Sequence, residues 1–338
     1  MSVMEPMQGL SSLDFGKEAF SPEVLNWIAQ EKLWNLWVPK SYGGLEMSLP
    51  EGLKKLRSLA KVDGSLGWTI TLCSGANFFI GNLKKAVADE IFIDPEKPVC
   101  FGGSGGVFGT AEKKGEGYVI SGTWKYATGA PYLTHFTLNA KIREDGKDVL
   151  QKDGTPLVRS FVLKKGEVQI IKDWNTMGLK ATATDSFEVR SKWVHEKYSF
   201  VYNELHQPHS IFKIPFSIFA DLTLWMNYIG MAAHFLEEAL KISSKNLSVD
   251  KLQKVIQKAD SLTMGYADQI QRKIDMGSEL PNTMTDEIHQ KALGSVRLLS
   301  DAIIRAYPLL GIAASKESHP LNQVFKDYFT ATQHHIFR

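Results

Sequence analysis

The chain has 338 residues, of which 43% are hydrophobic, and its 39 lysines and arginines nearly balance its 37 aspartates and glutamates. This length and apolar content allow two or three packed units with a substantial core. The balanced charge, and the lack of a dense basic cluster interleaved with aromatic residues, argue against nucleic-acid binding and favour small-molecule chemistry.

The cysteines, the histidines and the N-terminus each argue against a class of protein. Cys73 and Cys100 have no CxxC or zinc-ligand spacing, and His206 and His209 lack further ligands at a suitable spacing, so no metal site is expected. The N-terminus lacks the basic stretch and the apolar run of a signal peptide. A cytoplasmic protein is therefore predicted.

Helical periodicity dominates residues 21–83. Ser21 is suited to cap a first helix, and Pro22 is suited to its first turn. A second helix is expected after Pro50, and the apolar segment 62–83 predicts a further, largely buried helix. Residues 1–97 are therefore expected to form an N-terminal helical domain.

The periodicity changes between Pro98 and Phe200. Short alternating runs such as GYVISG and DSFEVRSKWV are separated by turn segments rich in glycine and lysine. This pattern predicts a compact, barrel-like β domain over residues 98–203.

Helical periodicity returns after Pro208. Four segments have helical character: 214–236, 252–262, 288–310 and 320–337. They predict a four-helix bundle over residues 204–338 and an α+β fold class for the whole chain. The first segment is long enough to cross a bilayer, but the polar residues Asp221, Asn227 and His234 lie within it. The preferred interpretation is a buried central helix of the bundle.

Two patterns in the β region are ambiguous when taken alone. The glycine-rich run 100–111 lacks the G-x-G-x-x-G spacing of a dinucleotide site, because Phe108 stands in place of the last glycine. In GYVISGTWKYATGA, residues 117–130, a strand with two aromatic residues ends on Thr128 and Gly129. A sheet face filled by bulky side chains and followed by a turn explains this segment without any site.

The order of these units, and several motifs within them, resemble the acyl-CoA dehydrogenase superfamily over roughly residues 21–337. LWNLWVPKSYGGLEMS and KVDGSLGW resemble its N-terminal motifs, and WNTMGLKATATDSFEVRSKWV resembles a motif of its middle domain. The segment 102–130 resembles the stretch that contacts flavin in that superfamily. The resemblance implies the superfamily's three-part fold and a flavin cofactor, FAD or FMN.

The same resemblance implies where the flavin binds. The implied contact residues are Phe101, Gly102, Gly103, Ser104, Tyr126, Ala127 and Thr128. The aromatic edge of Tyr126 would pack on the isoalloxazine ring, and the Thr128 hydroxyl would lie near the flavin N5. The glycine-rich strand would meet the pyrimidine side of the ring through its backbone groups.

Motifs near the C-terminus distinguish the two reaction types of the superfamily, those of the dehydrogenases and of the monooxygenases. The YEG-type segment that carries the catalytic glutamate of the dehydrogenases is absent. Instead HPLNQVFKDYFTATQHHIF, residues 319–337, resembles the last helix of the two-component flavin monooxygenases, which receive reduced flavin from a separate reductase. His334 would then be the family's active-site histidine, an acid/base or hydroperoxide-stabilising group, and a helix would turn His335 about 100° away from it.

The resemblance therefore favours a monooxygenase that acts through Thr128 and His334, and the alternative is an acyl-CoA dehydrogenase. Two departures keep a third hypothesis open. Lys326 replaces the arginine of an RD pair and cannot make its bidentate contact. Residues 241–251, KISSKNLSVDK, lack the arginine and the aromatic residue that often reach the flavin phosphate of a neighbouring subunit. The third hypothesis is a member of the superfamily that has lost flavin binding.

The quaternary structure can also be predicted. The superfamily architecture implies a homotetramer or homodimer that assembles through the C-terminal bundle. The nearly continuous apolar character of residues 214–236 supports this, because a short bundle covers such a helix poorly unless a neighbouring subunit contributes.

Overall fold

The computed structural model describes residues 18–242 and 247–337, and within these ranges the chain is a mixed α+β protein. The α-helices are α1 (Pro22–Gln30), α2 (Leu49–Val62), α3 (Gly64–Asn77), α4 (Lys85–Phe92), α5 (Phe216–Ile242), α6 (Leu247–Asp275), α7 (Thr283–Ala306) and α8 (Pro320–Ala331). The strands are β1 (Phe101–Lys114), β2 (Gly117–Ala127), β3 (His135–Glu144), β4 (Lys147–Asp148), β5 (Val158–Lys164), β6 (Gln169–Ile171), β7 (Asp185–His195) and β8 (Ser199–Phe200).

The chain order is helices, then strands, then helices, as the sequence predicts. Domain boundaries at residues 97 and 203 stay a prediction. Residues 243–246, part of the segment expected to lack a flavin-phosphate contact, lie outside the described residues.

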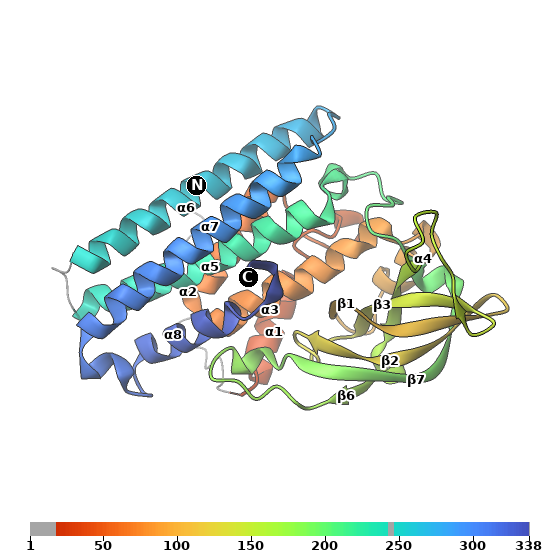
Figure 1. Cartoon of the computed structure of the whole chain (residues 1–338), viewed down its shortest axis with the longest axis horizontal. Helices are drawn as coiled ribbons and strands as arrows, with labels where there is room; N and C mark the ends of the chain where they lie inside the picture. The colour runs from red at the N-terminus through yellow and green to blue at the C-terminus, as the bar shows by residue number, and fades with distance from the viewer. Residues whose placement is uncertain (1–17, 243–246, 338) are drawn as a thin grey trace.

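The first helix begins where the sequence places its cap, and α2 begins at Leu49, one residue before Pro50. The Ser21 hydroxyl accepts a hydrogen bond from Val24 N, and Pro22 opens α1 as predicted. The Asp63 carboxylate accepts from Leu66 N at the start of α3. Almost every residue of α3 is buried, and the helix contacts β1, α5 and α8. It therefore lies between the sheet and the long helices (Figure 1).

The strands form one sheet in the order β6-β7-β2-β1-β3-β5-β8, with β4 paired to β3. β1 and β3 run parallel, and every other pair is antiparallel. The path of the described strands ends at β6 on one side and at β8 on the other, whereas a barrel needs a closed ring of strands. The domain expected to be barrel-like is therefore an open sheet in the described residues.

Two glycines allow the sheet to hold its largest side chain. Gly109 of β1 pairs with Gly122 of β2, and a Cβ at these positions would lie 2.3 Å and 2.8 Å from the indole ring of Trp124. Trp124 is fully buried, stacks on Phe187 and donates its indole N–H to the Asn139 carbonyl over 2.9 Å. Trp124 therefore serves the core of the β region, as the interpretation without a site predicts.

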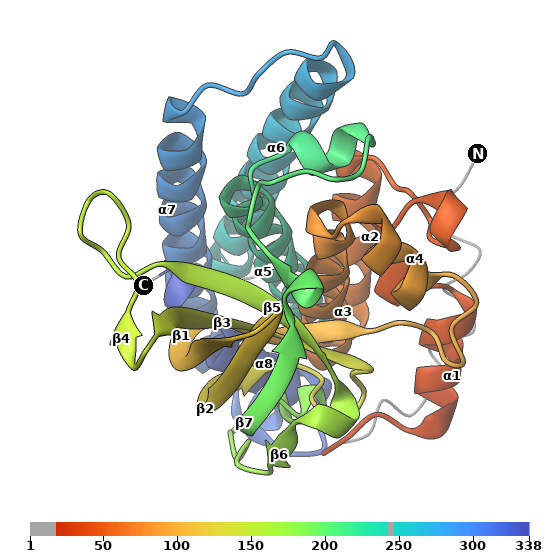
Figure 2. The ribbon, with the colours of Figure 1, turned by 90° about the vertical axis from the view of Figure 1, so that its right-hand side faces the viewer.

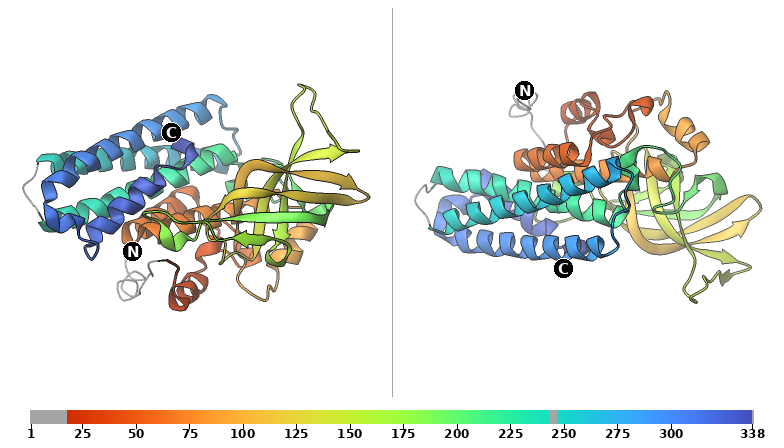
Figure 3. Two further views of the ribbon diagram at one scale, coloured as in Figure 1. Left: turned by 60° about the horizontal axis from the view of Figure 1, so that its bottom comes forward. Right: turned by 90° about the horizontal axis from the view of Figure 1, so that it is seen from above.

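α5 is the central helix of the C-terminal part and packs against α2, α3, α6, α7 and α8. Figure 2 shows α2 and α7 on opposite sides of it, and both views of Figure 3 place the long helices at one end of the molecule and the sheet at the other. Most of α5 is buried, including Asp221 and Asn227, so it is the buried central helix that the sequence predicts. In residues 18–242 and 247–337, no helix combines the length and the apolar character that crossing a membrane requires.

The last helix is shorter than expected. α8 ends at Ala331 instead of Phe337, and a short 3-10 turn follows over His335–Phe337. Tyr228 of α5 donates its hydroxyl to the Ala331 carbonyl over 2.6 Å, which satisfies one of the free carbonyls at the end of α8.

Candidate active site

The two segments expected to bind flavin lie side by side at the same end of the central strands β1 and β2. The Ser104 hydroxyl donates to the Lys125 carbonyl over 2.8 Å, and a Cβ at Gly102 would lie 3.0 Å from the Thr128 carbonyl. Cys73 of α3 approaches the same carbonyl, with its Sγ 3.5 Å from the oxygen. The start of β1 and the end of β2 therefore form one surface that meets α3.

The residues of this surface differ in what they can offer a ligand. The side chains of Phe101 and Ala127 are fully buried, and Phe101 N–H already donates to the amide of Asn77 over 2.7 Å. Gly103 cannot carry a side chain, because a Cβ there would lie 1.7 Å from the Thr137 carbonyl. Tyr126 is 46% exposed, so its ring is open to a ligand.

A second aromatic residue supports Tyr126. The ring of Trp174 lies edge-on to it, with centroids 5.8 Å apart. The Asp185 carboxylate accepts from Asp173 N and Trp174 N, each over 3.0 Å, and the Trp174 indole donates to the Leu179 carbonyl over 2.9 Å. These bonds fix the loop that holds the aromatic pair at the end of β2.

Thr128 ends a row of three buried hydroxyls. Thr184 Oγ1 donates to Thr128 Oγ1 over 3.2 Å, and Thr182 Oγ1 lies 2.7 Å from Thr184 Oγ1. The Thr182 hydroxyl also lies 2.6 Å from the Leu179 carbonyl, which competes with Thr184 for its single proton. Sequence reasoning identified only Thr128, because the convergence of the hydroxyls depends on the left-handed turn at Ala183, whose φ is 43°.

His334 packs against α3, the helix that also meets the surface formed by the start of β1 and the end of β2. Its half-buried ring packs edge-on against Trp68 of α3, with centroids 5.6 Å apart, whereas His335 is exposed. On the same helix, Cys73 lies 3.1 Å from the position that a Cβ at Gly129 would take. α3 therefore contacts both the end of β2 and the turn that follows α8.

The prediction that a helix turns His334 and His335 in different directions is wrong. Neither residue lies in α8, which ends at Ala331, and His335 begins the 3-10 turn. The helical angle between neighbouring residues therefore does not apply. The contact with Trp68 distinguishes His334 instead.

Asn77, which sequence reasoning missed, holds the start of β1. Its fully buried amide nitrogen donates to Asn35 Oδ1 over 2.6 Å and to the Val99 carbonyl over 2.9 Å, and its oxygen accepts from Phe101 N. One side chain thus joins α3, the N-terminal segment and the first strand. The only signal in the sequence is an asparagine within the apolar run SGANFFIG.

Two carboxyl groups, the partly buried Asp63 and the buried Asp327, lie where α3 meets α8. Asp327 Oδ1 accepts from Leu179 N over 2.5 Å and from Gln323 Nε2 over 2.8 Å, and its Cβ would lie 2.8 Å from a Cβ at Gly64. Burial raises the pKa of Asp63. Burial, and then the nearby charge of Asp63, raise the pKa of Asp327 to about 7.

The two cysteines lie close together in the core, which their spacing in the sequence does not reveal. Both thiols are free and buried, and burial together with the adjacent Cys73 raises the pKa of the Cys100 thiol well above its usual value. A thiol with a raised pKa, such as that of Cys100, is a poor nucleophile. Among the residues that the structure describes, no three or more Cys, His, Asp or Glu side chains are grouped to hold a metal ion.

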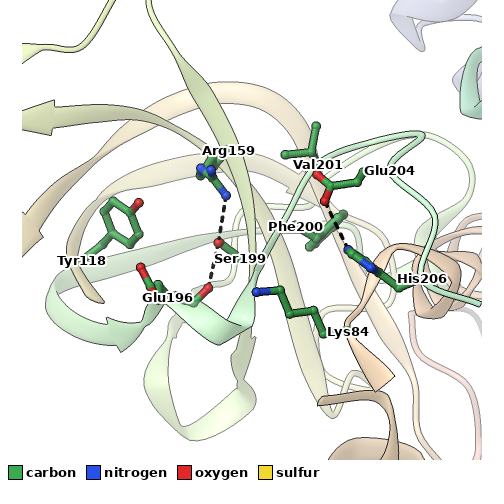
Figure 4. A pocket seen from close by; sticks show the side chains of 9 residues that line it. All are labelled: Lys84, Tyr118, Arg159, Glu196, Ser199, Phe200, Val201, Glu204 and His206. Carbon is green, nitrogen blue, oxygen red and sulfur yellow. Dashed lines mark hydrogen bonds and ion pairs between the residues drawn. The ribbon is translucent and has the colours of Figure 1, made fainter. Parts of the chain in front are cut away.

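A separate cavity of about 260 Å³ is lined by the first residues of β2 and β5, by β8 and by the N-terminus of α4 (Figure 4). Cationic Lys84 and Arg159 face it together with Glu196 and Glu204, and Glu204 pairs with His206 over 3.4 Å. The cavity contains none of the residues expected to bind flavin. Its mixed charge also suits a flavin ring poorly.

The strand surface, in contrast, fits a flavin ring. The exposed Tyr126 beside Trp174 offers a flat aromatic face, and the glycines allow close approach of the backbone. The Thr128 hydroxyl accepts a hydrogen bond from Thr184, and within the described residues it has no acceptor for its own proton. A planar ring with a polar edge can supply that partner.

The fold is shared with solved structures that include a monooxygenase and flavin-bound proteins. HsaA monooxygenase from Mycobacterium tuberculosis has a TM-score of 0.86 at 16% identity, with 95% of this chain and 88% of that chain covered. XiaF from a Streptomyces species, solved with FADH2 and glycerol, has a TM-score of 0.85 at 20% identity, with 95% and 86% covered. TdsC from a Paenibacillus species, solved with FMN and indole, has a TM-score of 0.77 at 17% identity, with 93% and 87% covered.

Sequence relatives span nearly the whole chain. Indole-3-acetate monooxygenases of Acinetobacter baumannii and Pseudomonas putida are 25% and 24% identical, over 95% and 93% of this chain and 85% and 83% of their own lengths. The flavin-dependent oxygenase subunit HsaA of Mycobacterium tuberculosis is 21% identical over 59% of this chain and 51% of its own. No protein-family profile matches the chain. The relatives are thus monooxygenases, the class that the C-terminal motif predicts.

Proposed function

We propose that this chain is the oxygenase component of a flavin-dependent monooxygenase, which receives reduced FMN or FAD from a separate reductase and oxygenates a small aromatic substrate. The broader class, a flavin-dependent oxidoreductase, agrees with relatives that match 95% of the chain. The observation that carries the proposal is that Thr128 and His334 both contact α3, through Cys73 and Trp68, and that Ser104 bonds to the strand that leads into Thr128.

The roles of the residues follow from their positions. A bound flavin would supply the electrons and the oxygen-transfer chemistry. Tyr126 would pack against the ring, Thr128 would hydrogen-bond at its N5 edge, and the backbone of residues 101–104 would meet the pyrimidine side. His334 would hold or move a proton at the substrate. The buried contacts between α3 and the strand ends would exclude water from this region.

The two alternatives have less support. An acyl-CoA dehydrogenase needs a glutamate base, and the segment that carries it in that branch is missing from the sequence. Loss of flavin binding is suggested only by Lys326 and by the segment 241–251. The exposed aromatic face of Tyr126 and the available Thr128 proton are features that such a loss would leave without purpose.

Anaerobic titration with reduced and oxidised FMN and FAD tests the proposal. We expect tighter binding of a reduced flavin and, after mixing with oxygen, hydroxylated product from indole-3-acetate, the first probe because two long relatives are named for it. Bleaching of a bound oxidised flavin by an acyl-CoA would support the dehydrogenase instead. Failure of both flavins to bind at saturating concentration would support the non-catalytic alternative.

A further inference from the structure

We infer that Thr184 is a positioning residue of this site, whose hydroxyl sets the direction of the Thr128 hydroxyl that meets the flavin. The inference rests on the proposed function for its flavin part. Its structural part, a hydrogen bond that orients Thr128, can be measured without flavin.

The geometry gives the first step. Thr184 Oγ1 donates to Thr128 Oγ1 over 3.2 Å, and both residues are 7% exposed. A threonine hydroxyl has one proton and two lone pairs. Since Thr184 occupies one lone pair of Thr128, the proton and the second lone pair of Thr128 remain for a ligand. In the described residues no other group hydrogen-bonds this hydroxyl, so Thr184 alone restricts its rotation.

The second step is that Thr184 is itself held in place. Thr182 Oγ1 lies 2.7 Å from Thr184 Oγ1, and the Thr182 carbonyl accepts from Gly129 N over 2.8 Å, directly after Thr128. The loop 179–184 is thereby tied to the end of β2 at two points. Two attachments fix the distance between the hydroxyls more firmly than one.

The third step links the loop that carries Thr182 and Thr184 to the C-terminal helix. Thr182 N donates to the Leu179 carbonyl over 3.2 Å, and Leu179 N donates to Asp327 of α8 over 2.5 Å. α8 leads into the turn that carries His334. The two residues proposed to do chemistry, Thr128 and His334, are thus connected through the loop that Thr184 belongs to.

A double-mutant cycle on the flavin-free protein tests the bond. Thr128→Val and Thr184→Val, alone and together, would be compared by urea unfolding. We expect coupling of about fivefold in the unfolding equilibrium constant, the size expected for one hydrogen bond. Thr263→Val is the matched control, because Thr263 is a fully buried threonine of α6 whose hydroxyl donates to the Ala259 carbonyl over 2.8 Å. Its effect should add to that of Thr128→Val.

Flavin titration tests the positioning role. We expect Thr184→Val to weaken binding of reduced flavin, or to change its reoxidation rate in air, by about tenfold, the effect of losing a buried partner. Thr184→Ser, which keeps the hydroxyl, should stay within about twofold of the parent.

The outcomes separate the two hypotheses. Additive effects of Thr128→Val and Thr184→Val would overturn the inference, even if the parent binds reduced flavin as proposed. Coupling accompanied by unchanged flavin binding and reoxidation in Thr184→Val would also overturn it. If the parent itself binds no flavin, the proposed function fails, and the positioning role toward flavin fails with it.

Discussion

Thr128 has little free space around it. Replacing it with leucine would add bulk at a position that is only 7% exposed and remove the hydroxyl to which Thr184 donates. We expect Thr128→Leu to weaken binding of reduced flavin by at least about tenfold, the effect of overpacking a tight site, while the sheet stays folded. Fluorescence titration measures the binding, circular dichroism checks the fold, and Thr128→Ser is the control that keeps the hydroxyl. A leucine variant with the affinity of the parent would remove Thr128 from the site.

His334 and His335 form a matched pair for a test of proton transfer. Only His334 packs against Trp68, and His335 is exposed. We expect His334→Ala to slow product formation by about 100-fold, as for the loss of a general acid or base, and His335→Ala to change it by less than about twofold. The pH dependence of the rate should lose one ionisation only in His334→Ala. Similar small effects of both substitutions would contradict the assignment.

The sequence indicates some residues of the site and not others, for a physical reason. Thr128 and His334 lie in motifs that resemble those of a family, so they can be named without a structure. Thr184, Asn77 and Asp327 act through partners that lie 56, 24 and 148 residues away in the chain. No local pattern encodes such contacts, because they exist only after the loops have folded.

At the scale of elements, α2 and α5 pack closely where they cross at Gly230. A Cβ at Gly230 would lie 2.5 Å from the Arg57 carbonyl and 2.7 Å from Ala60 Cβ. We expect Gly230→Ala to lower the free energy of unfolding by about 1 to 3 kcal/mol, because the helices must separate. Gly265 of α6 has no atom within 4 Å of such a Cβ. Gly265→Ala should therefore raise stability by up to about 1 kcal/mol.

Urea unfolding of both glycine variants measures this difference. A Gly230→Ala protein that is as stable as Gly265→Ala would show that α2 and α5 do not pack as closely as described.

The stability that α8 gains from its contact with the Leu179 loop should depend on pH. The pKa of Asp327 is raised to about 7, first by burial and then by Asp63. Because the folded protein holds this proton more tightly than the unfolded chain, stability should fall as the pH rises from about 4 to about 7. Relative to Asp327→Asn, the parent should lose up to about 1 kcal/mol of unfolding free energy per pH unit in this range.

Asparagine keeps the oxygen that accepts from Leu179 N, so it isolates the effect of the charge. The check is urea unfolding of both proteins at several pH values between 5 and 8. Parallel stability curves would show that Asp327 does not titrate in this window.

The existence and order of the elements could be predicted, but several of their ends and partners could not. Apolar periodicity predicts the helices before and after the strands, and Ser21 and Pro22 predict the start of α1. The end of α8 could not be foreseen, because the hydroxyl that satisfies the Ala331 carbonyl comes from Tyr228 on another helix. The open sheet likewise depends on which strands pair at its edges, and alternation alone does not determine that.

For the whole molecule, the reason given for oligomer formation is wrong although the prediction itself remains. α5 does not need a neighbouring subunit, because α2, α3, α6, α7 and α8 of the same chain cover it. Large apolar side chains stay exposed elsewhere, on α7 and the turn after it: Leu298, Ile304, Leu309 and Ile312. A second copy would bury such side chains.

We therefore still expect a homodimer or homotetramer. Light scattering at micromolar concentration should show it, and Leu309→Glu combined with Ile312→Glu should shift the mass toward the monomer. Leu247→Glu, which changes an exposed leucine on α6, is the control. A parent protein that is monomeric at this concentration would contradict the expectation.

The packing of α2 on α5 has a consequence for how the protein is made. α2 is complete at Val62, but α5 begins only at Phe216, after all of the strands. During synthesis, the apolar face of α2 therefore stays uncovered until the β region and then α5 have emerged from the ribosome. The N-terminal helices consequently cannot complete their core as an independent unit, and a nascent chain that pauses before α5 exposes a surface for chaperones to bind.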